Sequence, residues 1–543
     1  MESIELVLAM LLAAVASGYL VRIIPFSLPL PLIQISLGAV ISGVFERGVT
    51  LDPQIFFLLF LPPLLFLDGW RIPKDGLLRD KAAILEMSLG LVIFTVLGAG
   101  FLIHLMIPAM PLPVAFALAA VVSPTDPVAL AAIKGRAPIP KRLMHILEGE
   151  SLLNDATGLV CFRFAVAAAM TGSFSLLSAS QTFMWVSLAG AAIGVMVIIA
   201  IAAAQEWLGM QFGEHRGAPI LMNLLMPFGA YLTAEYLHAS GILAAVSAGI
   251  TMSYIEMRGR AYATMRVQRT AVWDMMHFTL NSIVFVLLGE QLPAILRDAA
   301  VSVEQSGHLN PWWLAIYALA INIGLILLRL TWVWASLRLT LFRASLRGES
   351  MATPHWRIVL ATSLAGVRGA ITMAGVLGLP FLMPDGSPFP ARDLAVFLAA
   401  SVILLSLITA SIGLPPLLKG LELPKASAET EEEDRARQAA AAAGIAAVEK
   451  THLDVPHDSD DAGSWTDAAA RVIAVYRLRL DRLEGEAAQL RMAEKAEREL
   501  RLAGLQAERE TLYSLLRQNS ISEETARKLI REVDLIETRF RLR

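Results

Sequence analysis

Long apolar stretches alternate with short polar segments from the N-terminus to about residue 418. A helix needs about 20 apolar residues to cross the hydrocarbon core of a bilayer, and the stretches reach or approach this length. The pattern predicts about 13 membrane spans. Their expected positions are residues 4–24, 28–45, 53–69, 83–107, 112–133, 143–170, 181–205, 218–238, 240–256, 272–296, 311–336, 357–382 and 392–417.

The composition agrees with an all-α polytopic membrane protein. The chain has 543 residues, of which 56% are hydrophobic and 17% charged, and its mean hydropathy is +0.60. Soluble domains have about 25% charged residues. The net charge of -3 leaves no dominant basic face for a nucleic acid. Cys161 is the only cysteine, which excludes an intrachain disulfide and a thiolate metal cluster. We expect no cofactor and no enzymatic activity.

The loop charges predict the orientation, because Lys and Arg concentrate on the cytoplasmic side of a membrane protein. Glu2 and Glu5 stand where a signal peptide has basic residues, so we interpret the first stretch as a retained span. An odd number of spans then places the N-terminus outside and the C-terminus in the cytoplasm, across the plasma membrane. The basic residues lie in alternate loops, at Arg71, Lys74, Arg79, Lys81, Lys134, Arg136, Lys141, Arg142, Arg258, Arg260, Arg266, Arg269, Arg338, Arg343 and Arg347.

Beyond Lys419 the composition changes to a charged tail. We expect a transmembrane domain over residues 1–418, a linker over 419–465 and a cytosolic helical domain over 466–543. Ser520-Ile-Ser-Glu523 matches a capping box that opens the last helix. Two interpretations of the tail stay open, a regulatory or dimeric helical unit and a charged helix without a regulatory role.

Two aspartates lie inside apolar runs, Asp126 after Thr125 and Asp155 after Asn154. A charge at membrane depth costs at least about 2.5 to 3.5 kcal/mol, so a chain keeps one there chiefly when something binds to it. Both aspartates therefore indicate an ion or proton site. The alternative for each is a structural ion pair with an arginine.

The predicted span 143–170 concentrates oxygen-bearing side chains. Ser151 and Asp155 stand four residues apart on one helix face, and Glu150 and Asn154 stand four apart on a neighbouring face. Hard cations such as sodium prefer oxygen ligands. Because burial disfavours the charged carboxylate, a proton competes with the cation for the same group. Such competition is sufficient for exchange. Ligand type admits potassium as readily as sodium.

Two predicted spans carry helix-breaking residues. Pro124 and Pro127 bracket Asp126, and a glycine-rich segment from Gly366 surrounds Arg368. Broken helices in corresponding positions of two halves indicate a transporter site at the bilayer midplane. A buried guanidinium needs a carboxylate partner, for which we expect Glu150. Arg163 lies two turns beyond Asp155 and either tunes that carboxyl group or pairs with another acid.

Three motifs together resemble a known family: Ser123-Pro-Thr-Asp-Pro127, Glu150-Ser-x-x-Asn-Asp155 and Gly366-x-Arg-Gly-Ala370. They closely resemble the sodium/proton exchangers of the first monovalent cation:proton antiporter family, especially its bacterial branch. The resemblance covers residues 1 to 418. It implies inverted repeats, two broken crossing helices and a homodimer in the lipid bilayer. It also implies a core bundle that moves against a dimerisation domain, with electroneutral sodium/proton exchange by alternating access in pH homeostasis.

The resemblance also implies roles for individual residues. Asp155 is the carrier of cation and proton, and Ser151 and Asn154 are ligands or supporting residues. Glu150 pairs with Arg368. The implied sodium ligands are Asp155, Asp126, Ser151 and Thr125.

One position departs from the family pattern. The family usually places an acidic residue directly after Leu-Pro-Pro-x-x-x, but here Leu67 follows and Asp68 comes one residue late. Each residue turns a helix by about 100°, so Asp68 is expected to face elsewhere. We interpret Asp68 as a span-end residue beside a basic loop, with at most a tuning effect.

An intramembrane aspartyl protease is the alternative from another class. It also needs two membrane-buried aspartates, a role open to Asp126 and Asp155. Its Gly-x-Gly-Asp motif is missing from the sequence, and Arg368 would have no task. A potassium/proton antiporter is the alternative within transport.

Overall fold

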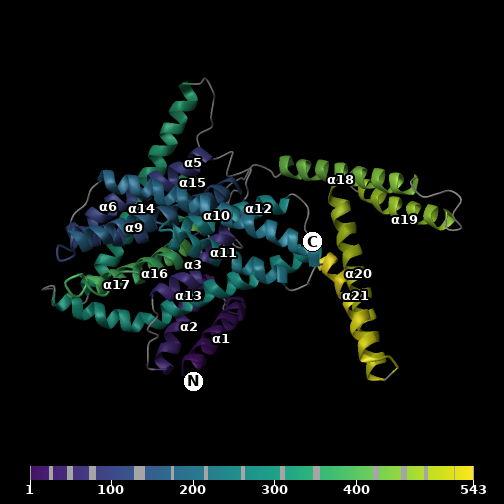
Figure 1. Cartoon of the computed structure of the whole chain (residues 1–543), viewed down its shortest axis with the longest axis horizontal. Helices are drawn as coiled ribbons and strands as arrows, with labels where there is room; N and C mark the ends of the chain where they lie inside the picture. The colour runs from purple at the N-terminus through teal and green to yellow at the C-terminus, as the bar shows by residue number, and fades with distance from the viewer. Residues whose placement is uncertain are drawn as a thin grey trace. The chain divides into compact units, whose positions relative to one another are not determined.

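The chain folds into two compact units, Met1–Leu421 and Glu422–Arg543, in the computed structural model (Figure 1). We describe each unit by itself. The structure describes residues 2–23, 28–45, 53–72, 81–126, 141–172, 176–212, 218–257, 263–305, 312–346, 355–419, 427–453, 462–481, 487–518 and 520–541. Seven of the fifteen basic loop residues that predict the orientation, and Pro127 of the first motif, lie outside these ranges.

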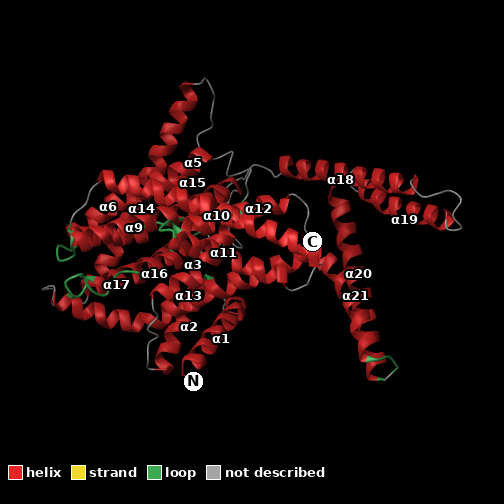
Figure 2. Ribbon diagram, viewed as in Figure 1, coloured by secondary structure: helices red, strands yellow, loops and turns green. Residues whose placement is uncertain are grey.

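Helices make up almost all of the described residues, and none of these residues forms a strand (Figure 2). The helices of the first unit are α1 (Glu2–Ile23), α2 (Leu30–Phe45), α3 (Pro53–Arg71), α5 (Lys81–Leu85), η1 (Glu86–Leu91), α6 (Val92–Met106), α7 (Leu112–Val122), α9 (Lys141–Thr171), α10 (Leu176–Phe212), α11 (Ala218–Tyr236), α12 (Gly241–Met257), α13 (Ala263–Gln305), α14 (Trp312–Leu346), α15 (Trp356–Leu364), α16 (Ala370–Leu377) and α17 (Arg392–Leu418).

Seven helices of the described residues are long and apolar enough to cross a membrane, and three shorter apolar helices accompany them. These helices carry exposed apolar side chains, such as those of Leu12, Leu105 and Trp185, as expected of helices that face lipid. This confirms the predicted all-α polytopic membrane fold. The count of 13 spans stays a prediction.

The helices of the first unit form two bundles. One, the α9 bundle, contains η1, α6, α7, α9, α14, α15, α16 and α17, and it holds most of the largest buried apolar cluster. The other, the α12 bundle, contains α1, α2, α3, α10, α11, α12 and α13. A further apolar cluster joins the two bundles, with Leu64 and Val246 from the α12 bundle and Ala156 and Ala374 from the α9 bundle.

Both predicted helix breaks are present in the α9 bundle. The first broken helix, α7, ends at Val122, and Ser123–Asp126 continue without helical structure. The second break separates α15, which ends at Leu364, from α16, which begins at Ala370. Proline lacks the amide hydrogen for a helical bond, and glycine makes helical backbone costly, so both motifs favour interruption.

The two breaks meet each other. The amide of Asp126 donates to the carbonyl oxygen of Val367 at 2.7 Å. In return, Nε of Arg368 donates to the carbonyl oxygen of Val122 at 2.9 Å. Each bond satisfies a backbone group that a continuous helix would have satisfied internally. The crossing of the two broken helices thus follows from their own unpaired backbone groups.

The second unit consists of two helix pairs, α18 (Ser427–Leu453) with α19 (Ala462–Asp481) and α20 (Ala487–Arg517) with α21 (Glu523–Arg541). Residues expected to form a linker, 419–465, include the long helix α18. The cap of α21 is Ser522, whose hydroxyl accepts from the amide of Thr525 at 3.2 Å, so the predicted cap at Ser520 was wrong. Ser522 precedes the first helical residue directly, which is the capping position.

Candidate functional site

A small cavity lies where the two breaks, α9 and the α12 bundle come together. Its volume is about 20 Å³, which is room for one water-sized particle. The α9 bundle and the α12 bundle each contribute part of its wall. The lining residues are Leu64, Asp68, Pro124, Thr125, Asp126, Ser151, Asp155, His277, Asn281, Gly369, Ile371 and Thr372.

Helix α9 presents Ser151 and Asp155 to this cavity from one face, as their four-residue spacing predicts. Both side chains are buried, with 4% and 5% of their surface exposed. The close approach of α9 to the first break depends on Gly158. A Cβ at that position would lie 2.4 Å from Cγ of Pro124. The glycine therefore lets the carboxyl group of Asp155 come beside the broken helix.

Asp126 lies against the start of α16. A Cβ at Gly369 would be only 1.7 Å from Oδ2 of Asp126, so glycine is required for this approach. Helix N-termini carry a partial positive charge that favours a carboxylate. The second break thus supplies both the space and a favourable field for Asp126.

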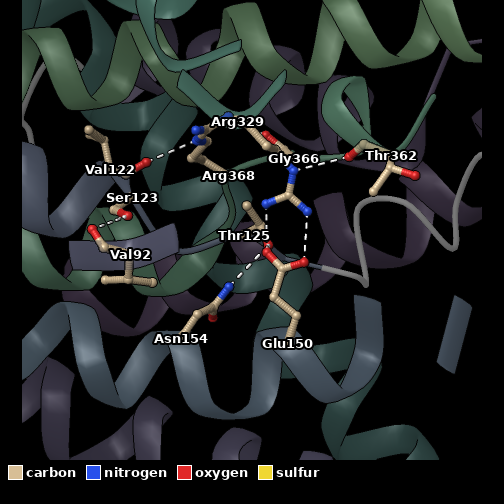
Figure 3. Close-up of polar contacts among 10 residues, drawn as sticks. All are labelled: Val92, Val122, Ser123, Thr125, Glu150, Asn154, Arg329, Thr362, Gly366 and Arg368. Atoms are coloured by element: carbon tan, nitrogen blue, oxygen red, sulfur yellow. Dashed lines mark hydrogen bonds and ion pairs between the residues drawn. The ribbon is translucent and has the colours of Figure 1, made fainter. Parts of the chain in front are cut away.

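Glu150 forms its ion pair with Arg329 of α14, so the predicted pair with Arg368 was wrong. Both carboxylate oxygens are held, Oε1 by Nη1 at 2.6 Å and Oε2 by Nη2 at 2.7 Å (Figure 3). Nε of Arg329 donates to the carbonyl oxygen of Thr362 at 3.0 Å. The pair is buried, with 3% and 1% of the two side chains exposed. Two-point geometry of this kind is what a planar guanidinium offers a carboxylate.

The same carboxylate anchors a short polar chain that ends at the first break. The hydroxyl of Thr125 donates to Oε1 of Glu150 at 3.1 Å, and Nδ2 of Asn154 donates to the hydroxyl oxygen of Thr125 at 3.1 Å (Figure 3). Thr125 also lines the cavity, whereas Asn154 lies behind it. Asn154 and Glu150 therefore fix the position of Thr125.

Arg368 serves the backbone of the two breaks. Its Nε donates to the carbonyl oxygen of Val122, and its Nη1 donates to that of Gly366 (Figure 3). Its own amide donates to the hydroxyl of Ser406 at 3.1 Å. Arg368 does not pair with Glu150 because the helix breaks leave carbonyl groups without a helical donor. The guanidinium of Arg368 donates its hydrogen bonds to these carbonyl oxygens instead.

Asp68 and Arg163, the two residues with a possible tuning effect, differ in their distance from the site: one lines the cavity and the other does not. Asp68 lines the cavity with Asp126 and Asp155, so the expectation that it faces elsewhere was wrong. Arg163 takes the second course predicted for it and pairs with another acid, Glu235, at 3.0 Å. Asp68 stands one position later than in the family pattern, but α3 is placed so that this side chain still lines the cavity. Sequence spacing does not specify that placement.

Sequence reasoning missed three residues of this region. Arg329 is an arginine inside an apolar run, and the rule that flagged the aspartates would have found it. His277 and Asn281 lie one helical turn apart on α13 and form the opposite wall of the cavity. Their sequence neighbourhood has no motif, so only the packing of α13 brings them there.

The arrangement brings three acidic side chains together in the interior of the first unit. Asp68, Asp126 and Asp155 share one small cavity, while the guanidinium groups of Arg329 and Arg368 are directed to other partners. Hydroxyl oxygens of Thr125 and Ser151 adjoin the carboxylates. Such a set of oxygens binds a small hard cation or, on a carboxylate, a proton.

Comparison with known proteins identifies the family. The family model of the transmembrane sodium/hydrogen exchangers matches residues 8–420. The chain belongs to this family of sodium/hydrogen exchangers. The exchanger is therefore a membrane antiporter of monovalent cations and protons and not an enzyme, and the protease alternative is set aside.

Named relatives extend the match over the whole chain. The exchanger is 41% identical to the Na⁺/H⁺ exchanger YjcE of Escherichia coli, over 99% of this chain and 98% of that protein. It is 38% identical to the sodium, potassium, lithium and rubidium/H⁺ antiporter of Bacillus pumilus, over 97% of this chain and 76% of that protein. These matches include the charged tail.

The fold is similar to a solved antiporter. The exchanger superposes on the sodium proton antiporter MjNhaP1 from Methanocaldococcus jannaschii with a TM-score of 0.54 and 18% sequence identity. The match covers 78% of this chain and 99% of that one. This likeness confirms the membrane fold.

Proposed function

We propose that the exchanger moves sodium against protons by alternating access, with Asp155 as the group that either ion occupies. The observation that carries this proposal is the cavity shared by three carboxylates and three hydroxyl-bearing residues, with Asp155 almost completely buried. Asp126, Thr125 and Ser151 complete the proposed sodium ligands, and Asn154 holds Thr125 in place.

Competition at one carboxyl group couples the two ions. A sodium ion needs the ionised carboxylate, and a proton removes that charge, so the two states exclude each other. Burial of Asp155 makes an empty, charged site unfavourable, since a carboxylate without a partner is costly in a dry environment. The transporter therefore changes sides with an ion bound and not with the site empty.

The location of the cavity between the two bundles supports alternating access. Asp126, Ser151 and Asp155 belong to the α9 bundle, while Asp68, His277 and Asn281 belong to the α12 bundle. A displacement of one bundle against the other changes the wall around Asp155. It thereby changes the side of the membrane from which an ion reaches that group.

Sodium is the first choice of substrate, and potassium is the alternative. The cavity of about 20 Å³ has room for one ion of either kind, and the match to the family of sodium/hydrogen exchangers supports sodium. The Bacillus pumilus relative, named for sodium, potassium, lithium and rubidium, keeps potassium as a second candidate. We also propose electroneutral exchange of one ion for one proton, serving pH homeostasis.

The proposal includes a homodimer in the plasma membrane, surrounded by lipid, with the N-terminus outside and the tail in the cytoplasm. The alternation of basic loops supports the orientation. Cysteines introduced at the two termini of a Cys161→Ser protein test it through labelling by an impermeant thiol reagent in intact cells. Crosslinking of the purified protein in lipid tests the dimer.

The central experiment measures proton movement driven by a sodium gradient in proteoliposomes, with potassium and lithium compared. Asp155→Asn and Asp126→Asn should each abolish exchange, because the carboxylate that binds the cation is lost. Asp393→Asn is the matched control, since Asp393 lies on α17 with 56% of its side chain exposed. Near-normal exchange by Asp155→Asn would show that Asp155 is not the carrier. An imposed voltage that alters the rate would contradict electroneutrality.

A further inference from the structure

A second cavity lies farther along α9, between the two bundles. Its volume is about 240 Å³, enough for several water molecules. Charged and polar side chains mix with apolar ones in its wall. The lining residues are Leu159, Val160, Arg163, Phe164, Thr182, Val186, Glu235, His238, Ala239, Ser240 and Ile242.

The ion pair of Arg163 and Glu235 lies in this wall and joins the two bundles. Nη2 of Arg163, on α9, lies 3.0 Å from Oε1 of Glu235, on α11. The same oxygen accepts from the amide of Gly241, the first residue of α12, at 3.3 Å. Glu235 is thus fixed to the α12 bundle by its helix and its hydrogen bond, whereas Arg163 moves with α9.

The second cavity is separated from Asp155 by a thin apolar layer. Leu159 lies one helical turn beyond Asp155, a rise of about 6 Å, and Arg163 lies one further turn along. Leu159 and Ile242 are both buried with 4% of their surface exposed, and they belong to the apolar cluster that joins the bundles. The same two residues line the second cavity. Along α9, Leu159 therefore lies between the second cavity and the level of Asp155.

The opposite approach to Asp155 has its own polar residues. Asp68 stands one turn before the end of α3, where Arg71 pairs with Asp274. Asp155 therefore lies between Asp68 on one side and the second cavity on the other. A carrier that serves two sides of a membrane needs two such approaches.

We propose that the second cavity is the vestibule through which a monovalent cation reaches Asp155 from the side opposite Asp68, and that Glu235 sets the cation affinity of that side. The inference rests on the proposed function. With the bundles as they stand, Arg163 neutralises Glu235, and the pair exerts no net attraction on a cation. When α9 moves, it carries Arg163 away and leaves the Glu235 carboxylate facing the vestibule, where a negative charge raises the local concentration of cations.

The test uses the opposite signs that this arrangement predicts for two variants of one ion pair. Glu235→Gln removes the attracting charge and should raise the KM for sodium at the vestibule side about 1.5- to 5-fold, the scale of a partly exposed charge pair. Arg163→Gln leaves the attracting charge in place and should lower that KM. A purely structural pair would shift KM in the same direction in both variants.

Sodium KM is measured from each face of oriented proteoliposomes containing the full chain. Thr182→Cys in a Cys161→Ser background, labelled by an impermeant thiol reagent, identifies the vestibule face. The matched control is Asp274→Asn, which breaks an ion pair between α3 and α13 within the α12 bundle and should leave the vestibule-side KM unchanged.

The proposal is overturned if the two variants shift KM in the same direction, if both faces change equally, or if neither face changes. Failure of the proposed function looks different, because Asp155→Asn would then keep its exchange activity. With Asp155→Asn inactive and the opposite signs absent, only the vestibule assignment is lost.

Discussion

Arg329 and Glu150 form a two-point ion pair in the interior of the α9 bundle, with distances of 2.6 and 2.7 Å between their nitrogens and oxygens. The pair joins α14 to α9, and through Thr125 it reaches the first helix break. Both carboxylate oxygens of Glu150 are therefore bound by this guanidinium. Asp155, five residues later on the same helix, has no such guanidinium partner among the described residues, and in our proposal it binds the transported ions.

Arg329→Ala should lower the thermal stability of the protein. The substitution leaves the Glu150 carboxylate buried without its counter-charge, which costs about 3 to 5 kcal/mol when one member of a buried pair is removed. Thermal unfolding in detergent, followed by tryptophan fluorescence or loss of monodisperse protein, measures the effect. The unfolding midpoint of Arg329→Lys should lie between those of Arg329→Ala and the native protein, because an ammonium group keeps the charge but not the two-point geometry.

Arg338→Ala is the control for that prediction. Arg338 lies on the same helix, exposed, with its guanidinium 5.5 Å from the ring centre of Trp334. Removing it should change the unfolding midpoint little. Equal midpoints for Arg329→Ala and Arg338→Ala would mean that the buried pair does not stabilise the bundle.

Asp68→Asn should weaken cation binding and preserve exchange. Asp68 contributes a carboxylate to the cavity wall, while the proposed carrier and its ligands stay intact in the variant. Loss of a neighbouring carboxylate typically lowers metal affinity about 10- to 100-fold. The measurement is the sodium KM from the face nearest Asp68 in proteoliposomes. A complete loss of exchange at saturating sodium would make Asp68 a carrier instead.

Much of the membrane fold and the acidic core of the site were predictable from the sequence. The reason is the cost of placing polar groups in a bilayer: Asp126 and Asp155 in apolar runs have few explanations other than function. Proline residues around Asp126 and glycine residues around Arg368 likewise predicted the two helix breaks. These are local properties of the chain, so they are readable without the tertiary structure.

Pairings between distant helices were not predictable in the same way. The choice of Glu150 between Arg368 and Arg329 depends on how α14 packs beside α9, a contact between positions 179 residues apart. Asp68 faces the cavity because of the rotation of α3 as a whole, which a family spacing does not specify. His277 and Asn281 needed the placement of α13.

Gly369→Ala should abolish or strongly reduce exchange in a protein that still folds. The added Cβ would meet Oδ2 of Asp126 at 1.7 Å, so either the carboxylate or the start of α16 must move. A displacement of about 1 Å in a positioned group costs on the order of 100-fold in rate. The rate is measured as sodium-driven proton movement in proteoliposomes, at matched protein content.

Gly43→Ala in α2 provides the matched control, because a Cβ there has no neighbour within 4 Å. It should leave both the rate and the unfolding midpoint close to those of the native protein. If Gly369→Ala exchanges as fast as Gly43→Ala, the close approach of Asp126 to the second break has no role in transport.

The apparent sodium KM should rise as the pH falls, whichever face is measured. Proton and sodium exclude each other at Asp155 in the proposed mechanism, so each unit of pH below the point of half-protonation raises the apparent KM by up to about tenfold. The maximal rate at saturating sodium should change less, because enough sodium displaces the proton. The decisive measurement is a KM series across the pH range at constant membrane voltage. A pH-independent KM with a falling maximal rate would place the proton on a different group, since binding at separate sites leaves the sodium affinity unchanged.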